Sequence, residues 1–384
     1  MDTFDKAAYF DPLYYALGGN ANRLQDFVDA VLADYNELLV EGFVWDNDLL
    51  DDFTYEQIER YYGIAPLANV VDPDSPAIPF AREGGSLGTG KIPRMKVVDY
   101  LNEAKIRTLK KLIRRNDVSA MRIAESAGAA IGEIIIDQTE SFVNALTYQR
   151  DQMVSTGKIV YNSTNNPYGI ALTLSGRVPS SNVTNLAGSA RWWTAADYAS
   201  EGANADPVQD MKNMVEVARK KGIIAGHFEI NNVFLDKILG HSKVQADIIA
   251  RLSLSARYTV TSLAPFSRDE QIAALSALVG KPIREMSHIS SVEYVEAGVK
   301  KTREFNSFAT DVVVFVPDGT IGEIKTVEPL LLEGGRYAFG LGGKLAFTIE
   351  ADYTKKCQSY SGELTTLCVP NKPKVMWYLY PCNI

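Results

Sequence analysis

Residues 85–91, Gly-Ser-Leu-Gly-Thr-Gly-Lys, come nearest to a motif with known chemistry. They fit the GxxxxGK pattern, in which backbone N–H groups cradle the phosphates of a nucleotide and the lysine contacts them. That pattern needs a Ser or Thr directly after the lysine to hold Mg²⁺, and then a helix whose N-terminus faces the phosphate. Here Ile92 and Pro93 follow the lysine. A nucleotide-binding enzyme that uses Gly85–Lys91 is therefore kept only as an alternative.

Other chemistry-bearing residues lack the spacing that a metal centre or a catalytic group requires. Asp46, Asp48, Asp51 and Asp52 are close in sequence, but the glycine and the terminal glutamate of a calcium loop are missing. The three cysteines form no CxxC pair and have no ligand spacing with the three histidines. We predict no catalytic residue, no metal, no cofactor and no enzymatic activity.

Charge is distributed unevenly along the chain. Its net charge is −8, yet residues 1–60 hold 14 acidic and 3 basic side chains, a net of −11, so the remainder carries +3. Residues 105–115 hold six cations and no acid: Lys105, Arg107, Lys110, Lys111, Arg114 and Arg115. An acidic total disfavours a protein that grips nucleic acid, and the run lacks interleaved aromatic side chains for stacking on single strands. We interpret the run as an intersubunit contact or an exposed start of a helix, with DNA binding as the alternative.

Hydrophobic periodicity and turn residues predict an α+β chain with protruding parts. We expect an amphipathic helix over 20–42 and a long helix over 118–156 that stops at Gly157. Between them, 61–97 is rich in Pro and Gly, which predicts an extended two-stranded loop. Its glycine-rich tip would contain Gly84, Gly85, Gly88 and Gly90, whose freedom at positive φ would let it bend onto another subunit.

The second half of the chain mixes helices and strands. Asp206-Pro207 has the cap and first-turn residues of a helix that ends at Gly222. Residues 290–305 predict a hairpin that turns at Ala297-Gly298, and 311–316 predict a buried strand. Trp192-Trp193 are expected as packing anchors. No apolar run approaches the ~20 residues of a membrane helix, and the first residues do not resemble a signal peptide, so we expect a cytoplasmic protein without membrane contact.

Four segments, in order along the chain, resemble the lambda-type major capsid proteins of tailed bacteriophages, which have the Hong Kong 97 capsid fold. They are FDPLYY (10–15), REGGSLGTGKIPRMKV (82–97), the basic run with the helix end MVSTGKIVYN (153–162), and YVEAGVKK (294–301). The resemblance implies an N-terminal arm, an extended loop, a long spine helix, and peripheral and axial domains. Residues 43–60 and 165–205 carry none of it.

The resemblance assigns a role and a place to each part of the chain. It implies an acidic arm at 1–60, an extended loop and basic lead-in at 61–117, a spine helix with peripheral strands at 118–205, an axial domain at 206–330, and C-terminal strands that return to the peripheral domain at 331–384. It implies hexamers and pentamers that close an icosahedral shell around double-stranded DNA without sequence-specific binding. Implied partners are a scaffolding protein, a portal and a decoration protein, with assembly in the bacterial cytoplasm and a final place in the virion. A cellular nanocompartment shell of the same fold is the nearest alternative.

Overall fold

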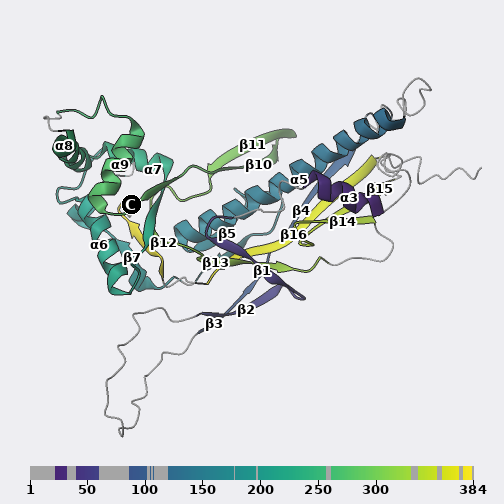
Figure 1. The fold of residues 1–384 in the computed structure, drawn as a ribbon, viewed down its shortest axis with the longest axis horizontal. Helices are drawn as coiled ribbons and strands as arrows, with labels where there is room; N and C mark the ends of the chain where they lie inside the picture. Colours follow the sequence, from purple (N-terminus) through teal and green to yellow (C-terminus); the bar gives the residue numbers. More distant parts are fainter. Residues whose placement is uncertain are drawn as a thin grey trace, which may run out of the picture.

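Figure 1 shows an elongated α+β molecule in which a long helix connects a helix-covered sheet at one end to a second sheet along its length. The computed structural model describes residues 22–32, 40–59, 86–101, 104, 107, 120–176, 178–195, 198–256, 261–329, 336–352, 357–371 and 375–382. The predicted α+β class is confirmed. The first described helix, α3 (Asn22–Val31), covers part of the helix expected over 20–42, and residues 33–39 lie outside the described ranges.

The long helix α5 (Ala120–Thr156) confirms the predicted helix over 118–156. Its apolar stripe is buried as the periodicity indicates, with Phe142, Leu146 and Met153 each at most 2% exposed. Gly157 ends the helix with φ +68°, a backbone conformation that favours glycine. A Cβ at that position would also lie 2.6 Å from the Val178 side chain, so Gly157 is required by both its conformation and its surroundings.

A six-stranded sheet packs against α5. Its central strand is β16 (Cys357–Pro370), which pairs with β4 (Arg94–Leu101), β13 (Gly322–Val327) and β15 (Leu345–Asp352). The outer strands are β1 (Phe43–Leu50), parallel to β13, and β14 (Arg336–Gly340), antiparallel to β15. Strands from the first and last hundred residues of the chain thus share one sheet.

Glutamine side chains of α5 bind backbone groups of β16. Gln138 donates to the Tyr360 carbonyl at 2.7 Å. Pairing of β16 with β4 ends at Thr365, and beyond that point Gln149 accepts from the Cys368 amide at 3.1 Å and donates to the Thr366 carbonyl at 3.3 Å. Because buried backbone groups need partners, the Gln149 amide takes the place of a neighbouring strand there.

The second sheet has five strands in the order β7-β17-β12-β8-β9. They are β7 (Val183–Asn185), β8 (Gly226–Asn231), β9 (Ile283–Met286), β12 (Val313–Pro317) and β17 (Trp377–Tyr380). Alternate residues of β12 enter two different cores: Val314 and Val316 pack in the core that includes α5, and Val313 and Phe315 in the other. Burial on both faces explains the continuous apolar run of the predicted strand.

Four helices cover the face of this sheet away from α5: α6 (Pro207–Lys220), α7 (Asn232–Gly240), α8 (Ser242–Ala256) and α9 (Arg268–Val279). The Asp206 carboxylate caps α6 by accepting from the Gln209 amide at 3.0 Å, as predicted. Trp192 and Trp193 are buried in this core and pack edge to face with ring centroids 6.2 Å apart, so they are packing anchors. β17, near the C-terminus, joins this sheet, and the expected division of the chain into an arm, a loop, and peripheral and axial domains stays a prediction.

The prediction of a glycine-rich loop tip is wrong for Gly88 and Gly90. Both lie within β3 (Ser86–Lys91), which pairs in antiparallel register with β2 (Thr54–Glu59). A Cβ on Gly90 would lie 2.5 Å from the Tyr55 ring, so close cross-strand packing, not positive φ, requires glycine there. Gly84 and Gly85 lie outside the described residues. Within the predicted acidic arm, residues 43–50 and 54–59 form the paired strands β1 and β2, with a turn between them.

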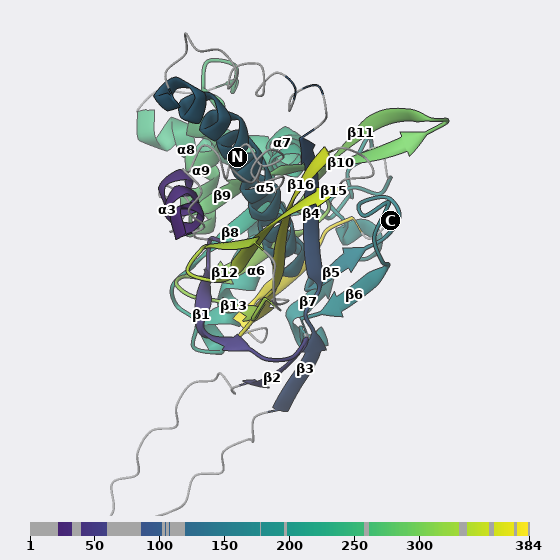
Figure 2. The same cartoon turned by 90° about the vertical axis from the view of Figure 1, so that its right-hand side faces the viewer.

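The predicted hairpin is confirmed as β10 (Ile289–Glu296) and β11 (Val299–Asn306). Ala297 and Gly298 between them have φ of +52° and +78°, the left-handed conformations that a two-residue primed turn requires. Figure 2 shows the hairpin projecting from the body of the molecule. A smaller hairpin, β5 (Lys158–Tyr161) with β6 (Leu172–Ser175), follows α5.

Substitution of Gly362 tests the packing of α5 on the sheet. A Cβ at this position would lie 2.8 Å from the Phe142 ring and 2.9 Å from Gln138 Oε1, both on α5. Gly362→Ala should lower the free energy of unfolding by about 1–3 kcal/mol, because the helix must shift. Urea denaturation measures this. Gly240→Ala is the control, since its Cβ would meet open space, and equal stability loss in both variants would contradict the packing argument.

Candidate functional site

Among the predicted contact residues, the structure describes only Gly88, Gly90 and Arg107. The first two lie in β3, and Arg107 is exposed. Gly84, Gly85, Lys105, Lys110, Lys111, Arg114 and Arg115 lie outside the described residues. The role of these ten residues in intersubunit contact therefore stays a prediction.

The β10–β11 hairpin has one face turned toward the molecule and one exposed. On the inner face, the Phe305 ring packs against Tyr148 of α5 with centroids 5.8 Å apart, and Arg303 donates to the Thr164 carbonyl at 3.2 Å. The outer face carries exposed Ile289 and Val295. A two-stranded hairpin is marginally stable alone in water, and Ile289 and Val295 lie exposed among polar and charged side chains, so this outer face is suited to contact with another chain.

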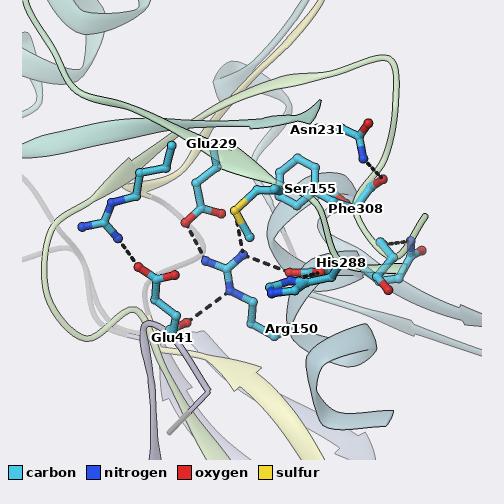
Figure 3. A network of polar contacts seen from close by, with 12 residues as sticks. Glu41, Arg150, Ser155, Glu229, Asn231, His288 and Phe308 are labelled. Carbon is cyan, nitrogen blue, oxygen red and sulfur yellow. Dashed lines mark hydrogen bonds and ion pairs between the residues drawn. The ribbon is translucent and has the colours of Figure 1, made fainter. Parts of the chain in front are cut away.

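A buried cluster of charges connects α5 to the five-stranded sheet (Figure 3). Arg150 donates to Glu229 Oε1 on β8 at 2.5 Å and to Asp151 Oδ1 at 3.0 Å. Its Nε donates to the carbonyl of Glu41, at 3.2 Å, in the segment before β1. Two histidines complete the cluster: His227 lies 3.3 Å from Glu229, and His288 lies 3.0 Å from Asp151. We call Arg150, Asp151, His227, Glu229 and His288 the joint.

Burial makes the joint electrostatically demanding. The side chains of Arg150, Asp151 and Glu229 are each at most 2% exposed. Burial alone lowers the pKa of Arg150, but the nearby Glu229 and Asp151 outweigh it and raise that pKa, so the guanidinium stays charged. Burial alone raises the pKa of Glu229, but Arg150 and His227 hold it below its usual value. Each charge in the joint depends on its partners.

Neighbouring polar contacts extend the attachment of α5. Gln152 donates to the Ser307 carbonyl at 2.7 Å, and Ser155 accepts from the Ala309 amide at 3.2 Å. On β8, Asn231 donates to the Phe308 carbonyl at 3.3 Å (Figure 3). The last two turns of α5 are thus bound through polar side chains to the segment between β11 and β12.

Sequence reasoning did not find the joint. The strand Gly226–Asn231 alternates polar and apolar residues, a pattern typical of a sheet with one face in water. All six of its residues are buried, and His227, Glu229 and Asn231 contact polar groups in the interior. An available signal was Arg150-Asp151 beside the apolar stripe of the predicted long helix, because two adjacent charges there need buried partners.

The motif-like residues have structural roles in the described part of the chain. Ser86–Lys91 is a strand followed by another strand, β4, whereas a phosphate loop needs a following helix. Asp46 forms an ion pair with Lys325 at 2.5 Å. Cys368 and Cys382 are free and buried. Within the described ranges, no group of three candidate ligands could hold a metal, and no helix is long and apolar enough to cross a membrane.

A family model described as phage major capsid protein E matches residues 42–326, which run from the start of β1 into β13. The chain belongs to the phage major capsid protein E family. The resemblance to lambda-type capsid proteins is thereby confirmed, and the family assigns the chain a structural role in a capsid. No curated protein matches the sequence.

Solved structures of other proteins were found to be similar to this chain. A protein described as a prophage capsid protein from E. coli CFT073 is 13% identical, with a TM-score of 0.50, and the match covers 94% of this chain and 98% of that one. A phage-related protein from Bordetella bronchiseptica RB50 is 12% identical over 94% and 97%, with a TM-score of 0.47. A chain of the satellite phage P4 procapsid is 10% identical over 95% and 100%, with a TM-score of 0.42. The likeness to the prophage protein shows the Hong Kong 97 capsid fold that the resemblance implied.

Replacing Arg150 tests the energetic role of the joint. Arg150→Met keeps most of the side-chain volume but leaves Glu229 and Asp151 buried without their cation. We expect the free energy of unfolding to fall by about 3–5 kcal/mol, because breaking one side of a buried ion pair leaves an uncompensated charge. Chemical denaturation followed by tryptophan fluorescence measures it. Arg219→Met, which removes an exposed pair with Glu216, should change stability little, and a similar loss in both variants would contradict the assigned role.

Proposed function

We propose that copies of this chain assemble into hexamers and pentamers that close an icosahedral shell around double-stranded phage DNA. The observation that carries the proposal is the family match over residues 42–326. The protein would assemble in the cytoplasm of a bacterial host and remain in the virion as its shell. It would act as a structural subunit without catalysis.

The projecting elements support a role in a multi-subunit shell. The β10–β11 hairpin and the β2–β3 pair extend from the two cores (Figure 1), and paired strands of this size gain stability when a further surface covers them. In a closed symmetric assembly each such contact is repeated in every subunit, so individually weak contacts add up to a stable particle.

The chain's charge fits enclosure of DNA without recognition of its sequence. A net charge of −8 disfavours strong counterion-driven binding along the inner surface. DNA that is driven into the shell needs no affinity for the wall. We propose a scaffolding protein and a portal as assembly partners, and a decoration protein on the outside.

Two alternatives have different cargoes or chemistry. A cellular nanocompartment shell would have the same fold and enclose an enzyme, but the match to a phage capsid family favours the phage shell. A nucleotide-binding enzyme would use Gly85–Lys91, and the strand at Ser86–Lys91 disfavours it. The nature of the enclosed material therefore separates the two shell hypotheses.

Shell formation tests the proposal. The chain, expressed together with the scaffolding protein of its phage, should form closed particles or capsomer-sized oligomers. Electron microscopy and light scattering measure this. Only a stable monomer in the presence of the scaffold would contradict the proposed function, and particles that enclose a host enzyme would support the nanocompartment.

A charge swap tests the proposed contact between the acidic N-terminal segment and the basic run of a neighbouring subunit. Asp51 and Asp52 are exposed at the turn before β2. Lys110→Glu with Lys111→Glu should reduce particle yield, and adding Asp51→Lys with Asp52→Lys should partly restore it. The contact should weaken with salt, since the screening length falls from ~10 Å at 0.1 M to ~3 Å at 1 M.

A matched pair on α6 controls for net charge. Lys212 and Lys220 are exposed, and changing both to Glu alters the net charge by the same amount. Those substitutions should leave the yield unchanged. Normal assembly of the Lys110→Glu, Lys111→Glu variant in low salt would show that the basic run makes no such contact.

A further inference from the structure

His227 lies between two carboxylates. Its Nδ1 is 2.9 Å from Asp318 Oδ1, in the turn after β12, and its Nε2 is 3.3 Å from Glu229 Oε1. A neutral imidazole has one N–H group, whereas an ionised carboxylate can only accept hydrogen bonds. Both contacts are satisfied together only when both ring nitrogens carry a proton. The geometry therefore requires the imidazolium form of His227.

His288 occupies a related position on the other side of Arg150. Its Nδ1 lies 3.0 Å from Asp151 Oδ2, while Asp151 Oδ1 accepts from Arg150. Asp151 is completely buried, and His288 is about half exposed, so its ring can exchange protons with solvent. His288 thus connects the segment between β9 and β10 to α5 through a buried carboxylate.

Charges around the two imidazoles balance only with both protonated. The acids and the fixed cations that face the rings come from α5, β8, β9, the turn after β12 and the segment before β1. They are Asp151, Glu229, Asp318 and Glu41 as acids, and Arg150 and Arg284 as cations, with Arg284 paired to Glu41. Four negative charges thus face two permanent positive ones. The protons on the two imidazoles supply the two positive charges that are missing.

We propose that the joint is a proton-dependent clasp, in which protonated His227 and His288 hold α5 against the five-stranded sheet. When the two protons are lost, the joint and the charged groups that face it together carry two uncompensated negative charges. Glu229 Oε2 is also buried and has no hydrogen-bond partner among the described residues, so after the loss of His227 the contact with Arg150 is what remains for that carboxylate. Deprotonation then weakens the attachment of α5 to the sheet.

The direction of the pKa shifts agrees with the geometry. Hydrogen bonding to Asp151 raises the pKa of His288 and outweighs the opposing effect of burial and Arg150. Burial alone lowers the pKa of His227, and its contacts with Glu229 and Asp318 reverse this into a net increase. The folded state therefore binds these protons more tightly than the unfolded chain. The resulting stabilisation is complete below the ordinary histidine pKa of 6.5 and is lost as the pH rises through the higher folded-state values.

His241 provides an internal comparison. The chain has three histidines, and His241 is the one outside the joint. It is buried between α7 and α8, 3.8 Å from Glu201. Burial is the largest influence there and lowers the pKa of His241 despite Glu201. One chain thus offers two histidines that should titrate high and one that should titrate low.

Hydrogen–deuterium exchange at the imidazole C2 position, followed by mass spectrometry, measures the pKa of each histidine in the full chain in any assembly state. His227 and His288 should titrate above 6.5, and His241 below it. Asp318→Asn should lower the pKa of His227 and leave that of His288 unchanged. Asp247→Asn on α8 is the matched control and should shift neither. A His227 pKa at or below that of free histidine would overturn the proposal.

Thermal unfolding measured at several pH values tests whether protonation of His227 and His288 stabilises the fold. The melting temperature of the native chain should fall as the pH rises from about 6.5 to about 8.5, a range set by the ordinary histidine pKa. The double variant His227→Gln, His288→Gln should lose most of this slope, and His241→Gln should keep it. An undiminished slope in the double variant would overturn the clasp. If that variant does not fold, Asp318→Asn decides, because it should reduce the slope without removing either ring.

Discussion

One helix, α5, has to contact two sheets, and this constraint organises the molecule. The 37 residues of α5 pack their apolar stripe on β16, and the C-terminal turns of the same helix also meet the five-stranded sheet. Where α5 meets buried backbone groups and carboxylates, its surface must also be polar, because such buried groups need partners. Gln138, Gln149 and Gln152 meet that requirement on carbonyl and amide groups, and Arg150 meets it on buried carboxylates.

This arrangement suits a shell subunit because the rigid, packed interior is separate from the strands that project toward other subunits. β12 is buried on both faces and contributes to both hydrophobic cores, so the two cores form one connected body. The β10–β11 hairpin projects beyond those cores, with Phe305 near its base packed against α5 (Figure 2). Repeated contacts between subunits can then be formed by projecting strands without repacking the interior. The joint differs from the rest of the interior, because it connects the two cores through charges that depend on protonation.

The sequence predicted elements better than it predicted their partners. α5, the α6 cap at Asp206, the turn at Ala297-Gly298 and strand β12 all depend on local signals, namely periodicity, capping and turn chemistry, and the structure confirms them. The glycine-rich segment shows the limit of such signals. Gly90 is required by a Tyr55 ring that belongs to a strand more than thirty residues away, so spacing within 82–97 could not reveal it. The joint was missed for the same reason, because alternation in β8 does not distinguish a solvated face from a buried polar one.

Strand pairing also changes how the net charge of the first sixty residues is interpreted. The first sixty residues sum to −11, which suggests an arm that repels itself and must find cations elsewhere. Part of that need is met within the chain, because β1 lies beside β13 and Asp46 pairs with Lys325, while Glu41 pairs with Arg284 of β9. Asp52 is held in a turn, where it accepts from the Phe53 amide and the Thr54 hydroxyl. The acids left for another subunit are therefore fewer than the sum implies, and among the described ones Asp48, Asp51 and Asp52 are exposed at or beside the turn between β1 and β2. A contact there would act at one defined place on the edge of the sheet, which favours setting the register between subunits over general electrostatic attraction.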